Sequence, residues 1–513
     1  MMPTLETLRS AGVLSPLDEH FASTLARLGR EERPEVLLAA ALVAGRVGDG
    51  HVCLDLGEVG GEPVRGPEGV AELEGCRWPA LDEWLDALGR SPLAAPGGPA
   101  PLVLEGTRLY LRRYHEHETE LARRILARAR RRDVRVDRER LRDGCRRLFP
   151  DGRRNPDWQR VAATLAVCRR LTVISGGPGT GKTWTVARIL ALLVEQGIAI
   201  HGRPPRLHLL APTGKAASRL RESIRESRGG LAVEESVRAA IPDETATIHR
   251  ALGVGGDGGF RHGADRPLVT DAVIVDEASM VDLALMSALF AAIPADARVI
   301  LLGDRDQLAS VEAGSVLADL CGEAPEESVS AETAALVADC GGEEVPRSAT
   351  AAPEIRDAVV RLRESRRFRE RPGIGALAEA VRTADAGAAL EALSGSFSDV
   401  SLDASGPPLA ERLAPLAARG YEPYLRRSSH EERLEAFGAF RILCAHRRGP
   451  AGIEALNPLV EATLAACRLL DLSDASYVHR PLLVTRNDPA IGLFNGDIGI
   501  VVRDGTGKKA LFP

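Results

Sequence analysis

The chain has 513 residues, of which 44% are hydrophobic and 27% are charged, and its formal net charge is −6. This length favours about three domains, and this composition is typical of a globular protein that buries several hydrophobic cores. A net negative charge excludes a generally basic nucleic-acid-binding protein, so any contact with DNA must come from local grooves.

The cysteines and the N-terminus bear on the cellular compartment. Eight cysteines are scattered along the chain without a C-x-x-C pair, which argues against a zinc site or a disulfide framework and favours a reducing cytoplasm. The first residues show no basic stretch followed by an apolar core, and no uninterrupted run of about 18 apolar residues occurs. We therefore expect a cytoplasmic protein that is neither exported nor embedded in a membrane.

Residues 1–110 show amphipathic helical patterns at 5–14 and 21–28, interrupted by Pro- and Gly-rich stretches. No catalytic constellation is visible there, so we predict a helical N-terminal domain that binds a partner, with a purely structural cap as the alternative. Residues 111–154 are predicted to form an arginine-rich helical connector. Its arginines either face DNA or, because acidic residues are interleaved among them, form a solvated face with i,i+4 ion pairs.

The segment 171–183, L-T-V-I-S-G-G-P-G-T-G-K-T, turns from an apolar run into glycines and ends in Lys-Thr. The spacing G-x-x-x-x-G-K-[ST] is that of a phosphate-binding loop, and a strand-like run precedes it and a helical run follows it, as the motif requires. Glycines let backbone N–H groups turn toward a phosphate at the start of a helix. The predicted loop comprises Gly176, Gly177, Pro178, Gly179, Thr180, Gly181, Lys182 and Thr183.

Within this loop, Lys182 is predicted to reach the β- and γ-phosphates of a nucleotide, and the Thr183 hydroxyl is predicted to hold Mg²⁺. Only four of the 66 basic residues are lysines, at positions 182, 215, 508 and 509. In a chain so biased toward arginine, a lysine indicates a place where a compact ammonium group fits and the planar guanidinium group of arginine does not.

Alternating strand-like and helical segments predict an α/β fold, with an open parallel sheet flanked by helices over residues 155–321. The strand-like segments are 171–175, 206–211, 272–276 and 297–302. Each of them ends in a polar loop, at the edge of the sheet where ligands bind in such folds.

Residues 322–355, which are rich in Glu, Ala and Ser, are predicted to be an acidic, solvated linker or insertion. Beyond them, 361–393 has a helical pattern, 441–445 and 482–485 are strand-like, and 494–502 indicates a turn into a further strand. These features predict the start of a second motor domain over residues 356–493.

Two strand ends carry residues suited to nucleotide chemistry. Asp276 and Glu277 follow an apolar strand, where Asp276 suits a Mg²⁺ ligand acting through water and Glu277 suits polarisation of the attacking water. Gln307 follows the next strand, and its amide can hydrogen-bond the γ-phosphate or the water and so sense hydrolysis. An ordinary turn is the alternative for the loop that holds Gln307.

Two further loops suit contacts to a DNA backbone. Pro212, Thr213 and Lys215 follow the second strand, and His249 lies ahead of the third. Small residues, hydroxyls and one cation at a strand end suit the sugar–phosphate backbone of a single strand, although His249 could instead be a core or cap residue. Gln159, ahead of the phosphate loop, either reads the edge of adenine through its amide or lies on a generic helix surface.

A series of motifs, taken in chain order, resembles the RecD family, the alpha subunits of exodeoxyribonuclease V. These motifs are G-G-P-G-T-G-K-T, A-P-T-G-K-A-A, T-I-H-R-A-L-G, V-D-E-A-S-M-V, G-D-R-D-Q-L-A-S-V-E-A-G, E-S-R-R-F and L-F-N-G-D-I-G. The resemblance runs from about residue 155 to residue 502, with a weaker match at 101–113. It implies a superfamily 1B DNA helicase with RecA-like P-loop motor domains, which uses ATP and Mg²⁺ to move 5′ to 3′ on single-stranded DNA.

The family further implies assembly with RecB-like and RecC-like subunits on double-stranded DNA ends, in double-strand break repair by recombination and in degradation of linear DNA. Residue by residue, the resemblance assigns Gln159 to adenine, Lys182 and Thr183 to the phosphate loop, and Asp276 and Glu277 to Mg²⁺ and water. It makes Gln307 the sensor and Arg367, in E-S-R-R-F, the arginine that reaches the γ-phosphate from the second motor domain. Pro212, Thr213, Lys215 and His249 fall in the DNA-contacting motifs.

The family's late motifs, T-V-H-K-S-Q-G and T-R-A-R, do not occur in this sequence. They would follow an SH3-like insertion whose start we expect at 494–513. We therefore expect a fragment with an incomplete second RecA-like domain, and the alternative is a truncated protein whose motor is incomplete. The nuclease chemistry is expected in a partner, because no acidic metal cluster is visible beyond the ATP site. The rival interpretations are a subunit that binds nucleotide but only scaffolds its partners, and an unrelated phosphate-loop kinase or GTPase.

Overall fold

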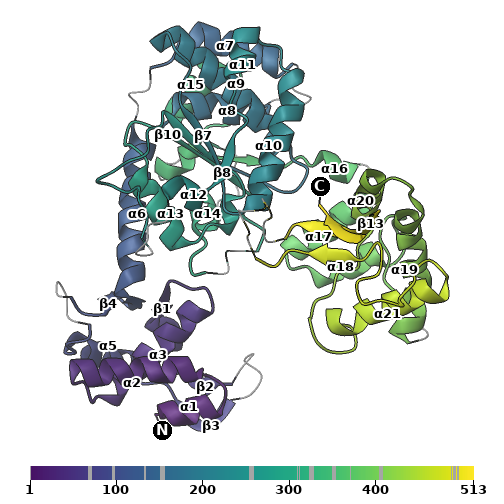
Figure 1. Cartoon of the computed structure of the whole chain (residues 1–513). Coiled ribbons are helices and arrows are strands. Elements are labelled where there is room, and N and C mark those ends of the chain that lie inside the picture. The colour runs from purple at the N-terminus through teal and green to yellow at the C-terminus, as the bar shows by residue number, and fades with distance from the viewer. Residues whose placement is uncertain are drawn as a thin grey trace. The chain divides into compact units, whose positions relative to one another are not determined.

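A computed structural model describes residues 2–512 apart from 67–71, 95–98, 132–134, 151–155, 254–258, 309, 311, 323–327, 349–353, 370, 404–407, 487, 489–490, 492, 494–495 and 506. The chain divides into two compact units, Met1–Glu370 and Arg371–Pro513. The parallel sheet lies in the first of these units (Figure 1).

In the described part of unit 1, six strands form one parallel sheet in the order β11-β6-β10-β9-β7-β8. The strands are β6 (Leu171–Gly176), β7 (Leu207–Ala211), β8 (Thr245–Thr247), β9 (Ala272–Val275), β10 (Arg298–Gly303) and β11 (Val359–Leu362). Helices lie on both faces of the sheet, so the predicted α/β fold is confirmed (Figure 1). All four strands predicted for this domain are present within one or two residues of their expected bounds.

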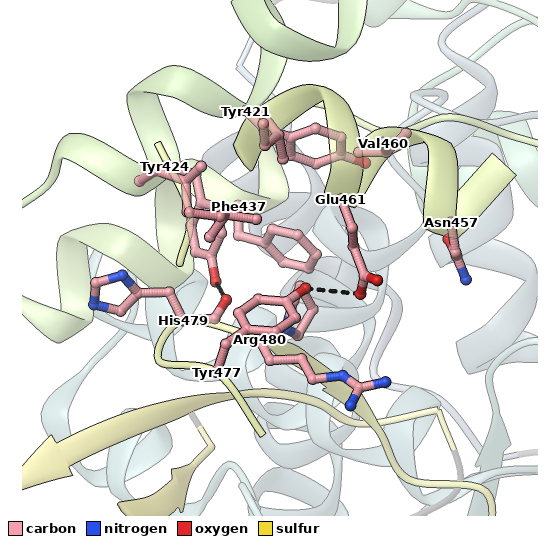
Figure 2. A pocket seen from close by; sticks show the side chains of 13 residues that line it. Tyr421, Tyr424, Phe437, Asn457, Val460, Glu461, Tyr477, His479 and Arg480 are labelled. Carbon is pink, nitrogen blue, oxygen red and sulfur yellow. Dashed lines mark hydrogen bonds between the residues drawn. The ribbon is translucent and has the colours of Figure 1, made fainter. Parts of the chain in front are cut away.

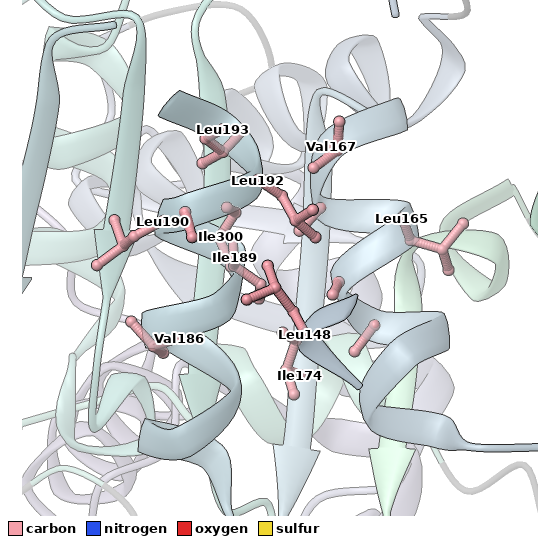
Figure 3. Packing of buried hydrophobic residues seen from close by; sticks show 14 of the residues in the cluster. Leu148, Leu165, Val167, Ile174, Val186, Ile189, Leu190, Leu192, Leu193 and Ile300 are labelled. Carbon is pink, nitrogen blue, oxygen red and sulfur yellow. The ribbon is translucent and has the colours of Figure 1, made fainter. Parts of the chain in front are cut away.

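Successive side chains of a strand point to opposite sides of the sheet. Because helices cover both sides, the strands are apolar and buried on both faces. Ile174 and Ile300 pack with α8 (Trp158–Cys168) and α9 (Lys182–His201) in one cluster (Figure 3). Val173 and Leu301 pack in a second cluster on the other face, with α6 (Arg112–Arg130) and α13 (Leu283–Ala292). This double cover fixes the sheet and leaves the loops at its carboxyl edge to form a site.

Helix α9 is long and apolar enough, by length and composition, to cross a membrane. However, 67% of its apolar window is buried inside unit 1, and the helix begins at the predicted phosphate-loop lysine. Its apolarity is therefore explained by burial in the core, where Val186, Ile189 and Leu190 are fully covered (Figure 3).

The N-terminal part contains α1 (Leu5–Ser10), α2 (Pro16–Gly29), α3 (Pro34–Gly48), α4 (Leu56–Val59) and α5 (Leu81–Gly89). The expectation of a helical domain is only partly right, because small antiparallel sheets accompany these helices. They are formed by β1 (Cys53–Asp55), β5 (Arg108–Leu111) and β4 (Leu102–Glu105), and by β2 (Pro63–Arg65) and β3 (Glu72–Arg77). Trp84 and Leu88 of α5 are fully buried in this part's own core.

The arginine-rich connector consists of α6 and α7 (Arg138–Leu148). Leu121 and Ile125 bury one face of α6, and the Arg128 guanidinium donates hydrogen bonds to the carbonyl oxygens of Ile293 (2.7 Å) and Pro294 (3.1 Å). Elsewhere on α6, Glu120 pairs with arginines three and four residues later, as expected for a solvated face. A DNA-facing role for this helix remains a prediction.

The prediction of a solvated linker at 322–355 is wrong for its described residues. Helix α15 (Ala331–Gly341) follows α14 (Val316–Cys321) and buries Thr333, Val337 and Cys340 completely against the core of unit 1. The Asp357 carboxylate accepts hydrogen bonds from the hydroxyls of Ser330 and Thr333, which fastens the segment to the residues just ahead of β11. Small core residues replace the large apolar ones that the sequence analysis looked for.

Unit 1 therefore extends beyond the boundary expected at residue 356. Strand β11 pairs in parallel with β6, with Val360 beside Ile174, and the unit continues through α16 (Arg366–Arg369). The helical pattern expected from residue 361 begins instead with the end of this strand. The strand joins the first sheet because Val360 and Leu362 are apolar enough to be buried there.

Unit 2 comprises α17 (Pro372–Arg382), α18 (Ala386–Leu393), α19 (Leu409–Arg426), α20 (His430–Gly438) and α21 (Ile453–Ala466). Among its described residues, β12 (Pro481–Leu483), β13 (Ile498–Asp504) and β14 (Gly507–Leu511) form an antiparallel sheet. Because β12 pairs with β13, the boundary predicted at 494 divides one sheet and is wrong. Residues 441–445, predicted as a strand, contain none. A second RecA-like domain and an SH3-like insertion remain predictions.

Candidate functional site

The predicted phosphate loop joins β6 to α9. Gly179 (φ 77°) and Gly181 (φ 84°) adopt the left-handed backbone conformation that favours glycine. The Lys182 ammonium donates hydrogen bonds to the carbonyl oxygens of Gly176 and Gly177, and the Thr180 hydroxyl donates to Gly177 O (2.8 Å). The loop therefore closes on itself around its lysine, at the N-terminus of a long helix whose dipole favours an anion.

Close packing also requires glycine in this loop. A Cβ on Gly176 would lie 2.6 Å from Thr180 Oγ1 and 2.9 Å from Leu362 Cβ, and a Cβ on Gly181 would lie 2.4 Å from Gln159 Nε2. At Gly176 the backbone of Leu362 leaves no room for a side chain, and at Gly181 a side chain would displace the Gln159 amide and strain a left-handed backbone conformation. The spacing found in the sequence thus reflects both the turn geometry and the neighbours of the loop.

Gln159 lies in the first turn of α8, which Asp157 caps by accepting hydrogen bonds from the backbone N–H groups of Gln159 (3.0 Å) and Arg160 (3.3 Å). The Gln159 amide nitrogen donates to the carbonyl oxygen of Thr180 at 2.8 Å. The side chain therefore contacts the phosphate loop and does not lie on a generic helix surface. Its role in reading adenine remains a prediction.

Asp276 and Glu277 follow β9, which is separated from β6 by β10. Asp276 is 9% exposed and accepts a hydrogen bond from the Glu277 backbone N–H (3.0 Å), while Glu277 adopts φ 52°. Burial and the charge of Glu277 raise the pKa of Asp276 to about 6, although the Lys182 ammonium acts in the opposite direction. A buried carboxylate in this position suits a ligand for a cation, because a cation favours the ionised form.

The loop after β10 contributes a residue that the sequence analysis missed. Asp304 is 5% exposed, and its Oδ1 accepts a hydrogen bond from the Asp306 backbone N–H (3.1 Å). A Cβ on Gly177 would lie 3.9 Å from Asp304 Oδ2, so this carboxylate adjoins the phosphate loop. Its position directly after the glycine that ends β10 was the available signal. Gln307, the predicted sensor, is exposed three residues later.

Arg367 corrects an expectation about the second motor domain. The Ser365 hydroxyl donates to the carbonyl oxygen of Pro178 (2.8 Å), and a Cβ on Gly179 would lie 2.7 Å from Arg367 Cβ. The segment after β11 therefore packs against the phosphate loop within unit 1, and Arg367 does not reach it from unit 2. The side chain of Arg367 is exposed, and its action on a γ-phosphate remains a prediction.

The predicted DNA-contacting residues lie just after β7 and β8, in the connections and first helical turns at the same edge of the sheet. Thr213 caps α10 (Gly214–Gly229) by accepting from the Ala216 N–H (3.2 Å), and half-buried Pro212 and Lys215 flank this cap. His249 is exposed on α12 (Ile248–Leu252), with its ring 5.9 Å from Phe260, so it is not a core residue. Since β7 and β8 are parallel neighbours, both loops emerge at their carboxyl ends. A DNA-binding role for them remains a prediction.

The arrangement fits a nucleoside triphosphate. Glycine N–H groups, a helix N-terminus and Lys182 offer positive charge to phosphates, and a nearby buried carboxylate suits a cation. Among the described residues, no group of three or more His, Cys, Asp and Glu side chains gathers as a metal site, at this edge or elsewhere. The L-F-N-G-D-I-G motif is only partly described, because residues 494 and 495 lie outside the described residues.

Comparisons with known proteins agree with this geometry. Residues 159–313 match the family model described as an AAA domain, and residues 10–110 match that of the RecBCD enzyme subunit RecD, N-terminal domain. The RecBCD enzyme subunit RecD of Mycolicibacterium smegmatis is 39% identical over 506 residues, which cover 98% of this chain and 82% of that protein. The corresponding subunit of Haemophilus influenzae is 31% identical over 553 residues, which cover 98% of this chain and 85% of that protein.

Over a shorter range, the ATP-dependent RecD2 DNA helicase of Deinococcus radiodurans is 39% identical over 189 residues, which cover 34% of this chain and 23% of that protein. Among solved structures, a Pif1 helicase from Candida albicans shares 14% identity at a TM-score of 0.31, covering 70% of this chain and 76% of that one. A likeness of that size adds nothing to what the sheet order already establishes.

Proposed function

The chain belongs to the RecD family of RecBCD enzyme subunits, and we propose that it is an ATP-dependent DNA helicase subunit that moves 5′ to 3′ along single-stranded DNA. The observation that carries the proposal is the arrangement of loops at one edge of one parallel sheet. The phosphate loop follows β6, the acidic pair follows β9, the sensor loop follows β10, and the loops suited to DNA follow β7 and β8.

The residues at this edge divide the work of ATP hydrolysis. Lys182 and the loop N–H groups would hold the phosphates, and Thr183 and Asp276 would hold Mg²⁺. When bound, this ion supplies charge stabilisation at the phosphates. Glu277 orients the attacking water and accepts its proton, Gln307 senses the γ-phosphate, and Arg367 offers positive charge to it.

The same edge explains how DNA could control hydrolysis. Pro212, Thr213 and Lys215 stand at the end of β7, which pairs directly with β9 and its acidic residues. A strand of DNA that contacts these residues and His249 would therefore act on elements adjoining Asp276 and Glu277. Hydrogen-bonded parallel strands lie about 4.8 Å apart, so a displacement of the end of β7 would also move the end of β9.

We further propose that RecB-like and RecC-like subunits are the partners, and that residues 10–110 provide a partner-binding surface. In this complex the nuclease chemistry belongs to a partner subunit. The assembly would act on double-stranded DNA ends in the cytoplasm, in recombinational repair and in degradation of linear DNA. The names of the RecBCD subunits in other bacteria support a complex of this kind.

The test is ATP hydrolysis by the purified chain, with and without single-stranded DNA, combined with unwinding of duplexes that carry a 5′ or a 3′ single-stranded tail. A motor is expected to hydrolyse ATP faster with DNA and to unwind from the 5′ tail. Absence of hydrolysis, with nucleotide still bound, would favour the scaffold interpretation. Hydrolysis that ignores DNA would favour an unrelated phosphate-loop enzyme.

A further inference from the structure

A cavity of about 220 Å³ lies within unit 2, away from the phosphate loop in the sequence. Helices α19, α20 and α21 and the segment leading into β12 line it, and its aromatic walls are Tyr421, Tyr424, Phe437 and Tyr477 (Figure 2). Aromatic residues make up only 4% of the chain, yet three of its five tyrosines line this one cavity. A concave site with aromatic walls and a few polar groups is typical of a ligand pocket.

The aromatic walls are held in place by contacts of their own. The Tyr421 and Phe437 rings stack with centroids 6.1 Å apart, and the Tyr424 and Phe437 rings meet at 4.9 Å. The Tyr424 hydroxyl donates to the carbonyl oxygen of His479, and the Arg441 guanidinium lies 3.9 Å over the Phe437 ring. Because these contacts hold the rings in place, the pocket is pre-organised for a flat ligand.

Polar groups at the pocket define which flat ligand fits. Glu461 Oε1 accepts a hydrogen bond from the Tyr477 hydroxyl (2.9 Å), and a carboxylate has capacity for more than one donor. Burial raises the pKa of Tyr477, so its hydroxyl stays protonated and remains the donor in this bond. Asn457 and Arg480 also line the pocket, the latter with its guanidinium 5.8 Å from the centre of the Tyr477 ring (Figure 2).

These features together suit a ligand that has a planar ring, hydrogen-bond donors on the edge of this ring, and an attached anion. A cavity of roughly 150 Å³ is known to hold benzene, so the volume found here suits one ring system and little more. Aromatic walls stack on a base, a carboxylate accepts from an exocyclic amino group, and a guanidinium pairs with a phosphate. We propose that this pocket binds one unpaired nucleobase of single-stranded DNA, with the adjoining phosphate on Arg480.

The proposal rests on the proposed function, since it assumes that the chain works on single-stranded DNA. It adds a contact to a base, whereas the loops at the edge of the sheet in unit 1 are suited to the backbone. Because Glu461 accepts hydrogen bonds, bases that present an amino group, namely cytosine, adenine and guanine, are expected to bind better than thymine.

The test uses the whole chain and an oligodeoxycytidine that carries one photoreactive 5-iodocytosine. After irradiation, mass spectrometry is expected to find the crosslink on Tyr421 or Tyr477. Crosslinks confined to other segments would contradict the proposal. Fluorescence anisotropy then compares three proteins: wild type, Tyr421→Ala and Tyr421→Phe. The first substitution removes a stacking wall and is expected to weaken binding about 5- to 100-fold, whereas the second keeps the ring and is expected to bind as wild type does.

Two further measurements complete the test. Glu461→Gln keeps an acceptor for Tyr477 and is expected to reduce the preference for oligodeoxycytidine over oligothymidine. Equal affinities of wild type and Tyr421→Ala, in a protein that binds DNA, would overturn the pocket alone, whereas a wild type that binds no DNA would overturn the proposed function as well. Free dCMP that binds without displacing the oligonucleotide would show a mononucleotide site and would also overturn the proposal.

Discussion

The amide nitrogen of Gln159 lies 2.8 Å from the carbonyl oxygen of Thr180 and donates a hydrogen bond to it. This bond connects the start of α8 to the phosphate loop within unit 1. Because the amide nitrogen carries two N–H groups, it can keep this bond and still donate to adenine, so a bound base and the phosphate loop would share one side chain. Base recognition and the conformation of the phosphate loop are therefore coupled at this residue.

Gln159→Ala is expected to weaken ATP binding about fivefold, since a typical neutral hydrogen bond contributes about 1 kcal/mol. It should also reduce the preference for ATP over GTP, because no amide remains to distinguish the two bases. Binding of both nucleotides by titration calorimetry checks this. An unchanged ATP-to-GTP ratio would show that Gln159 only supports the loop.

Glu277→Gln is expected to bind ATP and Mg²⁺ normally while hydrolysis falls at least about a hundredfold, because a glutamine cannot accept the proton of the attacking water. Asp276 keeps its hydrogen bond to the residue-277 backbone N–H, so the turn should be preserved. Nucleotide affinity and single-turnover rates are measured on the same preparation. A parallel loss of both would indicate a structural role for Glu277.

Asp304→Asn tests the carboxylate that the sequence analysis did not identify. The substitution keeps an oxygen that can accept from the Asp306 N–H but removes the buried charge beside Gly177. We expect ATP turnover to fall about tenfold or more, since hydrogen bonds that involve a charged group contribute about 1.5 to 3 kcal/mol. Asp306→Asn is the matched control, because its side chain is exposed and lies two residues farther along the loop. Equal rates for the two variants would exclude a role for Asp304.

The N-terminal part should lose stability in acid through Glu31. Its buried carboxylate accepts hydrogen bonds from Arg33 (2.8 and 2.7 Å) and from the Ser91 hydroxyl (2.6 Å). Chiefly through the bond from Arg33, the pKa of Glu31 falls from its ordinary 4.5 to about 2. A carboxyl group whose pKa is lower in the folded state stabilises the fold above its unfolded pKa, and this stability is lost as the pH falls from about 4.5 toward 2.

Glu31→Ala removes the buried acceptor of the hydrogen bonds from Arg33, whose own side chain is partly exposed, and is expected to cost about 2 kcal/mol of folding free energy at pH 7. Chemical denaturation followed at several pH values should show the difference from wild type shrinking as the pH falls below 4.5. Glu32→Ala, which changes the adjacent exposed residue, serves as the control. A difference that is independent of pH would contradict the account of Glu31.

The sequence predicted best where the centre of a strand is apolar and buried on both faces. Residues 171–175 and 297–302 were recognisable because β6 and β10 are buried on both faces and contain only apolar and small residues at their centres. Strand β8, Thr-Ala-Thr, and strand β11, which includes Arg361, lack that pattern. Strand β8 joins the sheet by pairing with β7, and β11 joins it by pairing with β6 and burying Val360 and Leu362, but a short segment of mixed polarity does not reveal either pairing.

The sequence predicted those parts of the site that depend on the spacing of residues within one motif. It did not predict the parts that depend on packing between segments far apart in the chain. The glycines and Lys182 follow from the geometry of a phosphate loop, but the approach of Ser365 to Pro178 depends on the pairing of β11 with β6. For the same reason, the placement of Arg367 in unit 1 could not be deduced from its motif. The sequence of α15 resembles a linker because small residues surround Val337 on its buried face.

The most direct test of the account is DNA-stimulated ATP hydrolysis by wild type and by Lys182→Ala. The substitution removes the cation that contacts the carbonyls of Gly176 and Gly177 and would face the phosphates, so turnover is expected to fall at least about a hundredfold while the fold persists. Circular dichroism and thermal unfolding of both proteins verify the fold. A wild-type rate that rises with single-stranded DNA, and is lost in Lys182→Ala, is the predicted result. A variant that keeps near wild-type DNA-stimulated hydrolysis would contradict the assignment of this loop and of the motor built around it.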